Sequence, residues 1–189
     1  MPAPDPSLLG PLAALIGTWE GTKGLDVSYH NAEKEVGDTP YRERVVMNPF
    51  GPVDNGNQCL YGLDYRMSAW RNDEVDPFHT EVGYWLWDGA AGQVMRCFMV
   101  PRGSTLIAGG AAKADSKVFS MQAELGSQTY GILSNLYLDQ MAKTTNFQCT
   151  ITVNDADSWS YEETTWVQLR HMSAPFAHTD ANTLRRVAS

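Results

Sequence analysis

The side chains best suited to chemistry lie in two segments far apart in the chain. His178 and Asp180 stand two residues apart in HTDANTLRR, and His79 and Glu81 stand two residues apart in FHTEVGYW. A neutral imidazole binds a transition-metal ion, and a nearby carboxylate orients such an imidazole by accepting its other N–H. The same groups can instead hydrogen-bond the polar head of an organic ligand and need no metal.

The orientation of His178 decides what this residue can do. In an extended strand, residues at alternate positions share a face, so an inward-facing His178 brings Asp180, Asn182 and Leu184 with it. An outward-facing His178 would be an ordinary solvated side chain. The elements around this segment therefore determine its role.

The composition is that of a globular protein with one core. The chain has 189 residues, 43% hydrophobic and 19% charged. We expect a single domain over residues 1–189, with a flexible leader at residues 1–6. The net charge of −8 disfavours nucleic acid and anionic membranes as partners, because both attract basic surfaces. The sequence leaves open whether two copies form a homodimer.

Three cysteines, Cys59, Cys97 and Cys149, lie far apart and form no CxxC pair. This odd, scattered set fits reduced thiols better than a disulfide framework or a zinc site. No run approaches the roughly 18 apolar residues of a membrane span, and the N-terminal residues lack the positive region of a secretory signal. We therefore expect a cytoplasmic location.

Most of the chain reads as β-strands. Segments rich in Val, Thr, Tyr, Trp and Phe alternate with a period of two and follow one another along the chain. The expected strands are 16–22, 41–47, 58–70, 78–88, 92–100, 104–111, 117–125, 144–153, 158–169 and 178–187. About ten strands joined by short turns favour an all-β, up-and-down antiparallel barrel, because closure removes exposed strand edges. A two-sheet sandwich is the alternative.

The remaining segments are expected to be short helices and loops. Ser7 can cap a short helix over LLGPLAALI, which Pro11 limits to one or two turns. A weaker helical pattern covers residues 130–142. We expect PFGPVDNGN to be a long loop, because Gly, Pro and Asn favour turns.

The segment 78–87 indicates that the barrel encloses a cavity. One of its faces carries Phe78, Thr80, Val82, Tyr84 and Leu86, and the other carries His79, Glu81, Gly83, Trp85 and Trp87. Either face therefore brings polar groups inward, where each unpaired polar group costs about 1–3 kcal/mol in a solid core. A hollow interior with a ligand or water avoids this cost. The expected pocket residues are Glu81, Tyr84, Trp85, Met99 and Asp180.

The first strand carries a second signal. Gly17-x-Trp19 after a short helix resembles the opening of the calycin barrels, the group that contains the lipocalins and fatty-acid-binding proteins. In that group an Arg of the last strand stacks on the Trp. Arg185 or Arg186 is expected to take this part by a cation–π contact, worth about 0.5–2 kcal/mol.

Three stretches together resemble the nitrobindin family of haem-binding barrels. They are LAALIGTWEGTKG, PFHTEVGYWLWD and HTDANTLRRV. The resemblance implies a calycin-like barrel that holds haem b, with His178 as the iron ligand and with His79 and Phe78 beside the haem. Lys23 replaces a glycine of the family's turn and would stand at the rim where the haem propionates would sit. The implied activity is binding of nitric oxide and isomerisation of peroxynitrite to nitrate.

The rival interpretation is a non-catalytic carrier of a fatty acid or another apolar small molecule. In that case the polar groups named above would be anchors for the ligand, without haem. Other chemistry has no support, since the sequence lacks GxSxG, P-loop and HExxH motifs. Glu162 and Glu163 fall on opposite faces of a strand, so they cannot act as an acid/base pair, and we expect a solvated edge to account for them.

Overall fold

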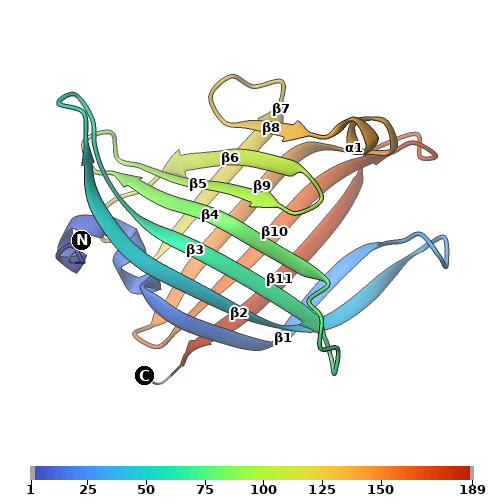
Figure 1. The fold of residues 1–189 in the computed structure, drawn as a ribbon, viewed down its shortest axis with the longest axis horizontal. Helices are drawn as coiled ribbons and strands as arrows, with labels where there is room; N and C mark the ends of the chain where they lie inside the picture. Colours follow the sequence, from blue (N-terminus) through green and yellow to red (C-terminus); the bar gives the residue numbers. More distant parts are fainter. Residues whose placement is uncertain (1–2, 188–189) are drawn as a thin grey trace.

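The computed structural model describes residues 3–187, which form a closed barrel of eleven strands (Figure 1). In the barrel the strands follow the order β1-β11-β10-β9-β7-β8-β6-β5-β4-β3-β2. The elements are η1 (Pro6–Leu15), β1 (Gly17–His30), β2 (Glu35–Asp54), β3 (Cys59–Arg71), β4 (His79–Asp88), β5 (Gln93–Val100), β6 (Ser104–Ala111), β7 (Val118–Leu125), β8 (Gly131–Ser134), α1 (Leu136–Met141), β9 (Ala142–Asp155), β10 (Ser158–Leu169) and β11 (Phe176–Arg186). The predicted all-β antiparallel barrel is confirmed, and the sandwich is excluded.

The strands form where the sequence alternates. In β7 the side chains of Phe119, Met121 and Ala123 are buried while their neighbours are exposed. The first and last strands pair with each other, so Trp19 lies opposite Arg186 and the sheet closes. Closure leaves one interior, and its filling differs from one end of the barrel to the other.

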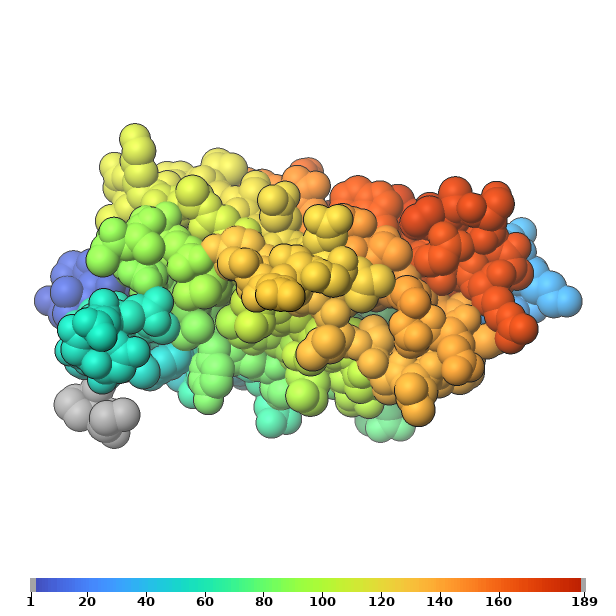
Figure 2. All heavy atoms as spheres, turned by 90° about the horizontal axis from the view of Figure 1, so that it is seen from above, coloured from blue at the N-terminus to red at the C-terminus, as the bar shows by residue number. Residues whose placement is uncertain are grey.

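One seam of the barrel is irregular. The short strand β8 lies between β6 and β7 at one end, where it pairs antiparallel with β6 and parallel with β7. In the described part of the chain, β6 and β7 pair directly at a single position, Gly109 with Gln122. The ring of Tyr130 covers Gly109, and a Cβ there would lie 2.2 Å from that ring. In Figure 2 the segment from β6 to α1, yellow to orange, covers the middle of the visible face.

Several local predictions need correction. The N-cap of η1 is Asp5, not Ser7, and its carboxylate accepts hydrogen bonds from the backbone N–H and the hydroxyl of Ser7. Residues 130–142 combine a strand and one helical turn instead of one helix. Residues 49–54, expected in a loop, continue β2.

The first two residues of the expected leader lie outside the described residues, and Pro6 already belongs to η1. Cys59, Cys97 and Cys149 are free thiols, as the sequence predicts. Among residues 3–187, the structure has no helix with the length and apolar character needed to span a bilayer.

The end of the barrel beside η1 is closed by packed apolar side chains. Leu9, Leu12 and Leu15 of η1 are fully buried, and Gly10, at φ +54°, breaks the helix where the indole of Trp87 lies against the backbone. Trp19 lies behind them, and its indole N–H donates to the carbonyl oxygen of Leu15 at 2.8 Å.

Arg186 completes this closure from the last strand. Its guanidinium lies 4.2 Å from the ring centre of Trp19 and donates to the carbonyl oxygens of Ile16 and Ala156. The expected cation–π pair is therefore present, and Arg186 rather than Arg185 forms it.

Candidate functional site

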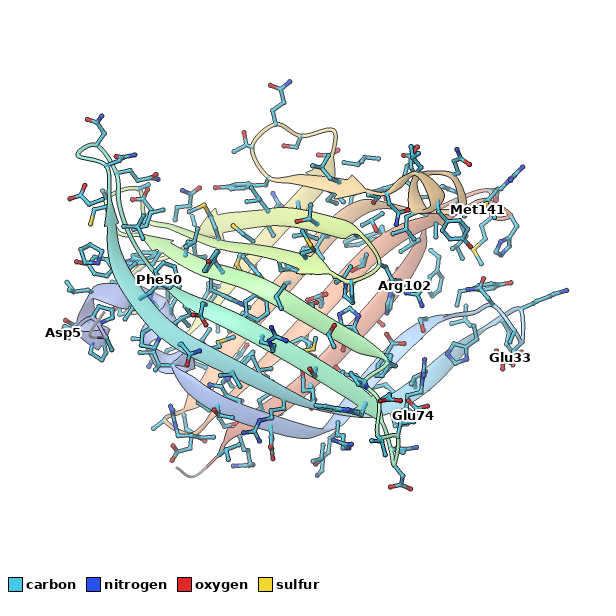
Figure 3. All side chains as sticks on the ribbon, in the orientation of Figure 1. Asp5, Glu33, Phe50, Glu74, Arg102 and Met141 are labelled. Atoms are coloured by element: carbon cyan, nitrogen blue, oxygen red, sulfur yellow. The ribbon has the colours of Figure 1, made fainter. Side chains whose placement is uncertain are left out.

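The opposite end of the barrel opens into a cavity of about 670 Å³, which we call the outer cavity. This volume lies within the range of roughly 300–1,000 Å³ for small-molecule pockets. Glu33, Arg102 and Met141, labelled in Figure 3, stand around this end, away from Asp5 at the closed end. The apolar part of the cavity wall includes Phe78, Phe98, Leu106 and Phe147.

His178 lines the outer cavity from β11. Strand alternation places Asp180, Asn182 and Leu184 on the same inner face, and exposure falls from His178, whose side chain is 34% exposed, to Leu184, which is fully buried. An outward-facing His178 is thereby excluded. The residue stands where the cavity is still accessible from outside.

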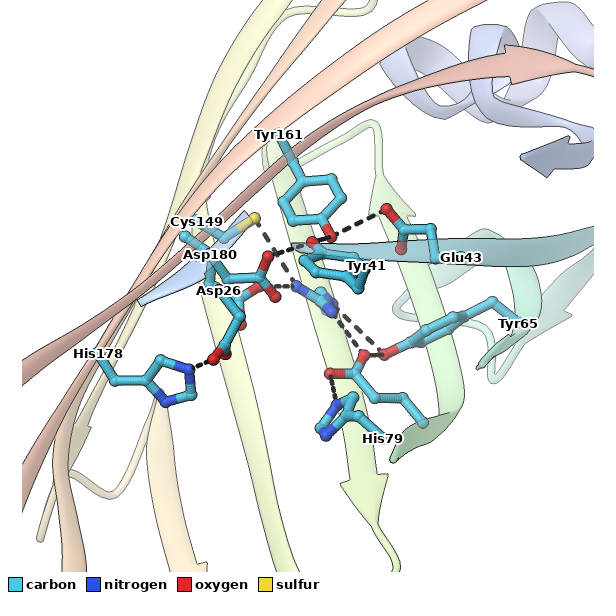
Figure 4. A network of polar contacts seen from close by, with 12 residues as sticks. Asp26, Tyr41, Glu43, Tyr65, His79, Cys149, Tyr161, His178 and Asp180 are labelled. Carbon is cyan, nitrogen blue, oxygen red and sulfur yellow. Dashed lines mark hydrogen bonds and ion pairs between the residues drawn. The ribbon is translucent and has the colours of Figure 1, made fainter. Parts of the chain in front are cut away.

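Asp26 of β1 holds the imidazole of His178 (Figure 4). The carboxylate contacts Nε2 of His178 and also accepts a hydrogen bond from Ser28 at 2.6 Å. Burial opposes the charged imidazole, but the hydrogen bond and charge of Asp26 outweigh it and raise the pKa of His178. Although burial acts against the carboxylate of Asp26, the same contact lowers its pKa. This is the carboxylate–imidazole pairing that commonly supports a metal-bound histidine.

Arg96 of β5 binds the carboxylates of Glu81 and Glu163, which form the floor of the outer cavity. Its guanidinium donates to Glu81 and to Glu163, each at 2.6 Å, and Glu81 also accepts from the hydroxyl of Tyr65 and contacts His79. Burial raises the pKa of Glu81, but Arg96 and His79 overcome this and hold it at about 2. Burial opposes the charged form of His79, yet Glu81 raises its pKa.

The expectation for Glu163 is wrong. The side chain is 13% exposed and bound to Arg96, so it lies inside the barrel and not at a solvated edge. Glu162 faces outward, which confirms that the two carboxylates point to opposite faces. Alternation separates the pair correctly, but it does not say which of the two faces the interior.

A smaller space of about 30 Å³, which we call the inner chamber, adjoins the outer cavity. Met67, Glu81, Glu163 and Asp180 line both spaces. The rest of the chamber wall includes Glu43, Trp85, Arg96, Trp159 and Tyr161. Such a volume holds one or two water-sized groups.

A chain of hydrogen bonds runs along the wall of the inner chamber (Figure 4). Glu43 accepts from Tyr161 at 3.0 Å and from the amide of Asn182 at 2.7 Å. The hydroxyl of Tyr161 lies 2.6 Å from that of Tyr41, which donates to Asp180. Burial is the main reason that the pKa of Glu43 rises to about 7 and that the pKa of Asp180 rises well above its usual range.

The predicted site residues separate into two groups. His178, His79, Phe78, Glu81 and Asp180 line the outer cavity, and Trp85 lines the inner chamber. The structure therefore places these six residues around two adjoining spaces.

Tyr84, Met99 and Lys23 need correction. Tyr84 and Met99 are 52% and 53% exposed on the outer surface, because they alternate with the inward-facing Trp85 and Phe98. Lys23 is exposed at a bulge of β1 and does not border the cavity. Arg71 and Arg102 are the basic side chains that line the cavity instead.

Sequence reasoning missed Asp26, Glu43 and Arg96. The alternation of β5 contains a usable signal for Arg96, since Val94 and Phe98 at the neighbouring alternate positions are apolar and a lone Arg between them shares their inner face. Asp26 and Glu43 offer no comparable signal, because their partners are distant in sequence.

The possible metal ligands of this cavity fit a metal ion that a macrocycle such as haem already coordinates. Within the described residues, no three His, Cys, Asp or Glu side chains converge to hold a metal ion by themselves. A haem group would need only one protein ligand for its iron. The imidazole of His178 has the chemistry of such a ligand: Nε2 contacts Asp26, and Nδ1 forms no hydrogen bond within the described chain.

Comparison with known proteins points to one family. A family model described as a THAP4-like, heme-binding beta-barrel domain matches residues 8–186. The crystal structure of Rv2717c from M. tuberculosis superposes with a TM-score of 0.66, at 21% sequence identity, over 97% of this chain and 99% of that one. No curated protein sequence matches this chain. The structural likeness supports the fold, and the family model extends over nearly all of the barrel.

Proposed function

The chain belongs to the THAP4-like, heme-binding β-barrel family, the nitrobindin family, and on that premise we propose that it binds haem b in the outer cavity through His178. One observation carries the proposal. The imidazole of His178 lines a cavity of about 670 Å³, with one ring nitrogen engaged by Asp26 and the other facing no partner in the described chain.

When bound, ferric haem would supply the Lewis-acid centre at which nitric oxide binds and peroxynitrite rearranges to nitrate. The remaining roles belong to the chain. Asp26 orients the imidazole and keeps it electron-rich by accepting its N–H. Phe98 and Phe147 exclude water from one side of the cavity, and Arg71 and Arg102 can neutralise the propionates of the cofactor.

His79 is placed to act on a small oxygen-containing ligand in the same cavity. It is held by Glu81, whose hydrogen bond and charge raise its pKa against the effect of burial. A protonated imidazole donates hydrogen bonds from both nitrogens, so one N–H remains to hold an oxyanion. We therefore assign His79 a stabilising role beside the ligand.

Titration of the purified protein with hemin tests the proposal. We expect a Soret band with saturable one-to-one binding, and we expect His178→Ala to lose it. His171→Ala is the matched control, because His171 lies in the exposed turn before β11 and is not among the residues that line the outer cavity. If His178→Ala binds hemin with the same spectrum as the unaltered protein, His178 is not the iron ligand. Stopped-flow decay of peroxynitrite, with nitrate as product, then tests the isomerase activity of the loaded protein.

The rival function, a fatty-acid carrier, predicts a colourless protein that rejects hemin and co-purifies with lipid. The floor of the cavity argues against it, because its arginine, Arg96, is already paired with Glu81 and Glu163 and is not free to bind a fatty-acid carboxylate. Mass spectrometry of the protein as isolated separates the two functions. The three unpaired thiols fit a reducing compartment, and we place the activity in the cytoplasm.

A further inference from the structure

Two buried carboxylates of the inner chamber, Glu43 and Asp180, form no ion pair within the described residues. Arg96 is shared by Glu81 and Glu163. In residues 3–187 neither Glu43 nor Asp180 takes part in an ion pair, and their partners are the neutral groups of Tyr41, Tyr161 and Asn182. The pKa of Glu43, raised by burial to about 7, shows how poorly its charge is compensated. A cation in the chamber would supply the missing charge.

Two indole N–H groups also lack a partner at this place. Trp85 and Trp159 are 2% and 3% exposed, and their rings line the inner chamber. Neither Nε1 has an acceptor in the described chain. A buried donor without a partner costs about 1–3 kcal/mol, so the chamber suits a polar guest rather than an apolar one.

The walls of the chamber already accommodate a cation. The guanidinium of Arg96 lies 5.2 Å from the ring centre of Trp85, which lines the inner chamber, and 4.4 Å from that of Phe98, which lines the outer cavity. Aromatic faces combined with carboxylates are the usual surroundings of bound ammonium groups. Besides the carboxylates and Arg96, the chamber is lined by the rings of Trp159 and Tyr161 and by apolar side chains such as Met47 and Ile151.

The outer cavity complements this acidic floor with apolar surface. Phe98, Leu106 and Phe147 line it, and Asp180 marks the boundary between the two spaces. A molecule that occupies both spaces therefore needs a cationic end and an apolar body. The inner volume of about 30 Å³ admits an ammonium group and one water, which can accept from the indoles.

We propose that the two spaces together bind an amphipathic primary amine, with its ammonium group between Glu43 and Asp180 and its apolar body against Phe98, Leu106 and Phe147. The site needs no iron, so this inference goes beyond the haem-binding function. The same carboxylates discriminate against a ligand of equal shape that carries a negative charge.

Isothermal titration of the full chain, purified without haem, tests the proposal with three probes of equal length. We expect hexylamine to bind at least about tenfold more tightly than hexanol, since hydrogen bonds to charged groups are the stronger ones. We expect hexanoate to bind more weakly than either. Hexanol or hexanoate binding as tightly as hexylamine, or no binding by hexylamine, overturns the proposal.

Two isosteric variants locate the ammonium group. Glu43→Gln and Asp180→Asn should each weaken hexylamine by about tenfold and leave hexanol unchanged. Glu33→Gln is the matched control, because Glu33 is exposed and lines only the mouth of the outer cavity. Equal loss in the control would mean that general negative charge, and not the chamber, attracts the amine.

Either variant could fail to fold, so the melting temperature of each is measured first. Only a variant that retains the melting temperature of the unaltered protein is interpreted. Hemin titration of the same preparations is measured separately. Failure of hemin to bind contradicts the proposed function and leaves the amine titration intact, and failure of the amine leaves the hemin result intact.

Discussion

The two ends of this barrel are built from the same strands, but one end is packed with apolar side chains and the other is hollow and lined with charged groups. At the closed end, Leu12, Leu15 and Trp19 are buried, and the one indole N–H among them donates to a backbone carbonyl close in sequence. At the open end, carboxylates face a cavity and depend on partners from distant strands. Strand β11 joins both ends, with Leu184 in the packed half and His178 in the hollow half.

This difference separates stability from function along one axis of the molecule. The packed end gains free energy from apolar burial and needs no ligand. The hollow end keeps buried charges that a solid core would not tolerate, and such groups are concentrated where proteins bind ligands. Substitutions at the two ends should therefore differ in kind as well as in size.

Removing Arg96 should give the largest effect. Arg96→Met leaves Glu81 and Glu163 buried without a cation, and we expect the free energy of unfolding to fall by about 3–5 kcal/mol. Urea denaturation measures the change. Arg44→Met is the matched control: its ion pair with Glu20 is half exposed, and its loss should cost no more than about 1 kcal/mol. If both variants lose the same free energy of unfolding, the buried ion pairs of Arg96 contribute no more to stability than the exposed pair of Arg44.

The pH dependence of stability should distinguish the buried carboxylates. The pKa of Glu43 rises from 4.5 to about 7 on folding, so the native state binds this proton more tightly than the unfolded chain. The free energy of unfolding should therefore fall by roughly 3 kcal/mol as pH rises from about 4.5 to 7, and Glu43→Gln should remove this fall.

Glu81 acts in the opposite direction and provides the control. Its pKa falls to about 2, so its contribution is present above pH 4.5 and is lost as the pH falls towards 2. Thermal melts of Glu43→Gln should keep this acid limb. If Glu43→Gln instead loses the fall in stability at low pH, that fall belongs to Glu43 and not to Glu81, which contradicts the assignment.

The smallest effect is expected at the closed end. Arg186→Lys keeps the charge but cannot contact Ile16, Ala156 and the ring of Trp19 together, and we expect a loss of about 0.5–2 kcal/mol. Arg185→Lys is the matched control, because Arg185 is exposed and should change nothing measurable. Hemin and amine binding should be unaffected in both variants, since this end does not border the cavity.

The closed end could be predicted from the sequence to a large extent. Gly17, Trp19 and the two C-terminal arginines form a local pattern, and the alternation of the strands indicates the barrel. The choice between Arg185 and Arg186 required the register of β1 against β11, which places Trp19 opposite Arg186.

The open end could be predicted only in part. Alternation groups His79, Glu81 and Trp85 on one face, and the same rule excludes Tyr84, which the sequence analysis nevertheless placed in the pocket. Alternation does not tell which partner a buried charge finds. Arg96 and Glu163 are 67 residues apart and Asp26 and His178 are 152 apart, so these contacts depend on closure of the whole barrel.

The irregular seam between β6 and β7 gives the wall an uneven mechanical strength. Every other pair of adjacent long strands is joined by a ladder of several residue pairs, whereas these two strands share one direct pair in the described chain. Local opening follows the line with the fewest backbone hydrogen bonds. We therefore expect the wall to open first along this line, where β8 alone bridges the two strands at one end, while η1 and Trp19 keep the far end closed.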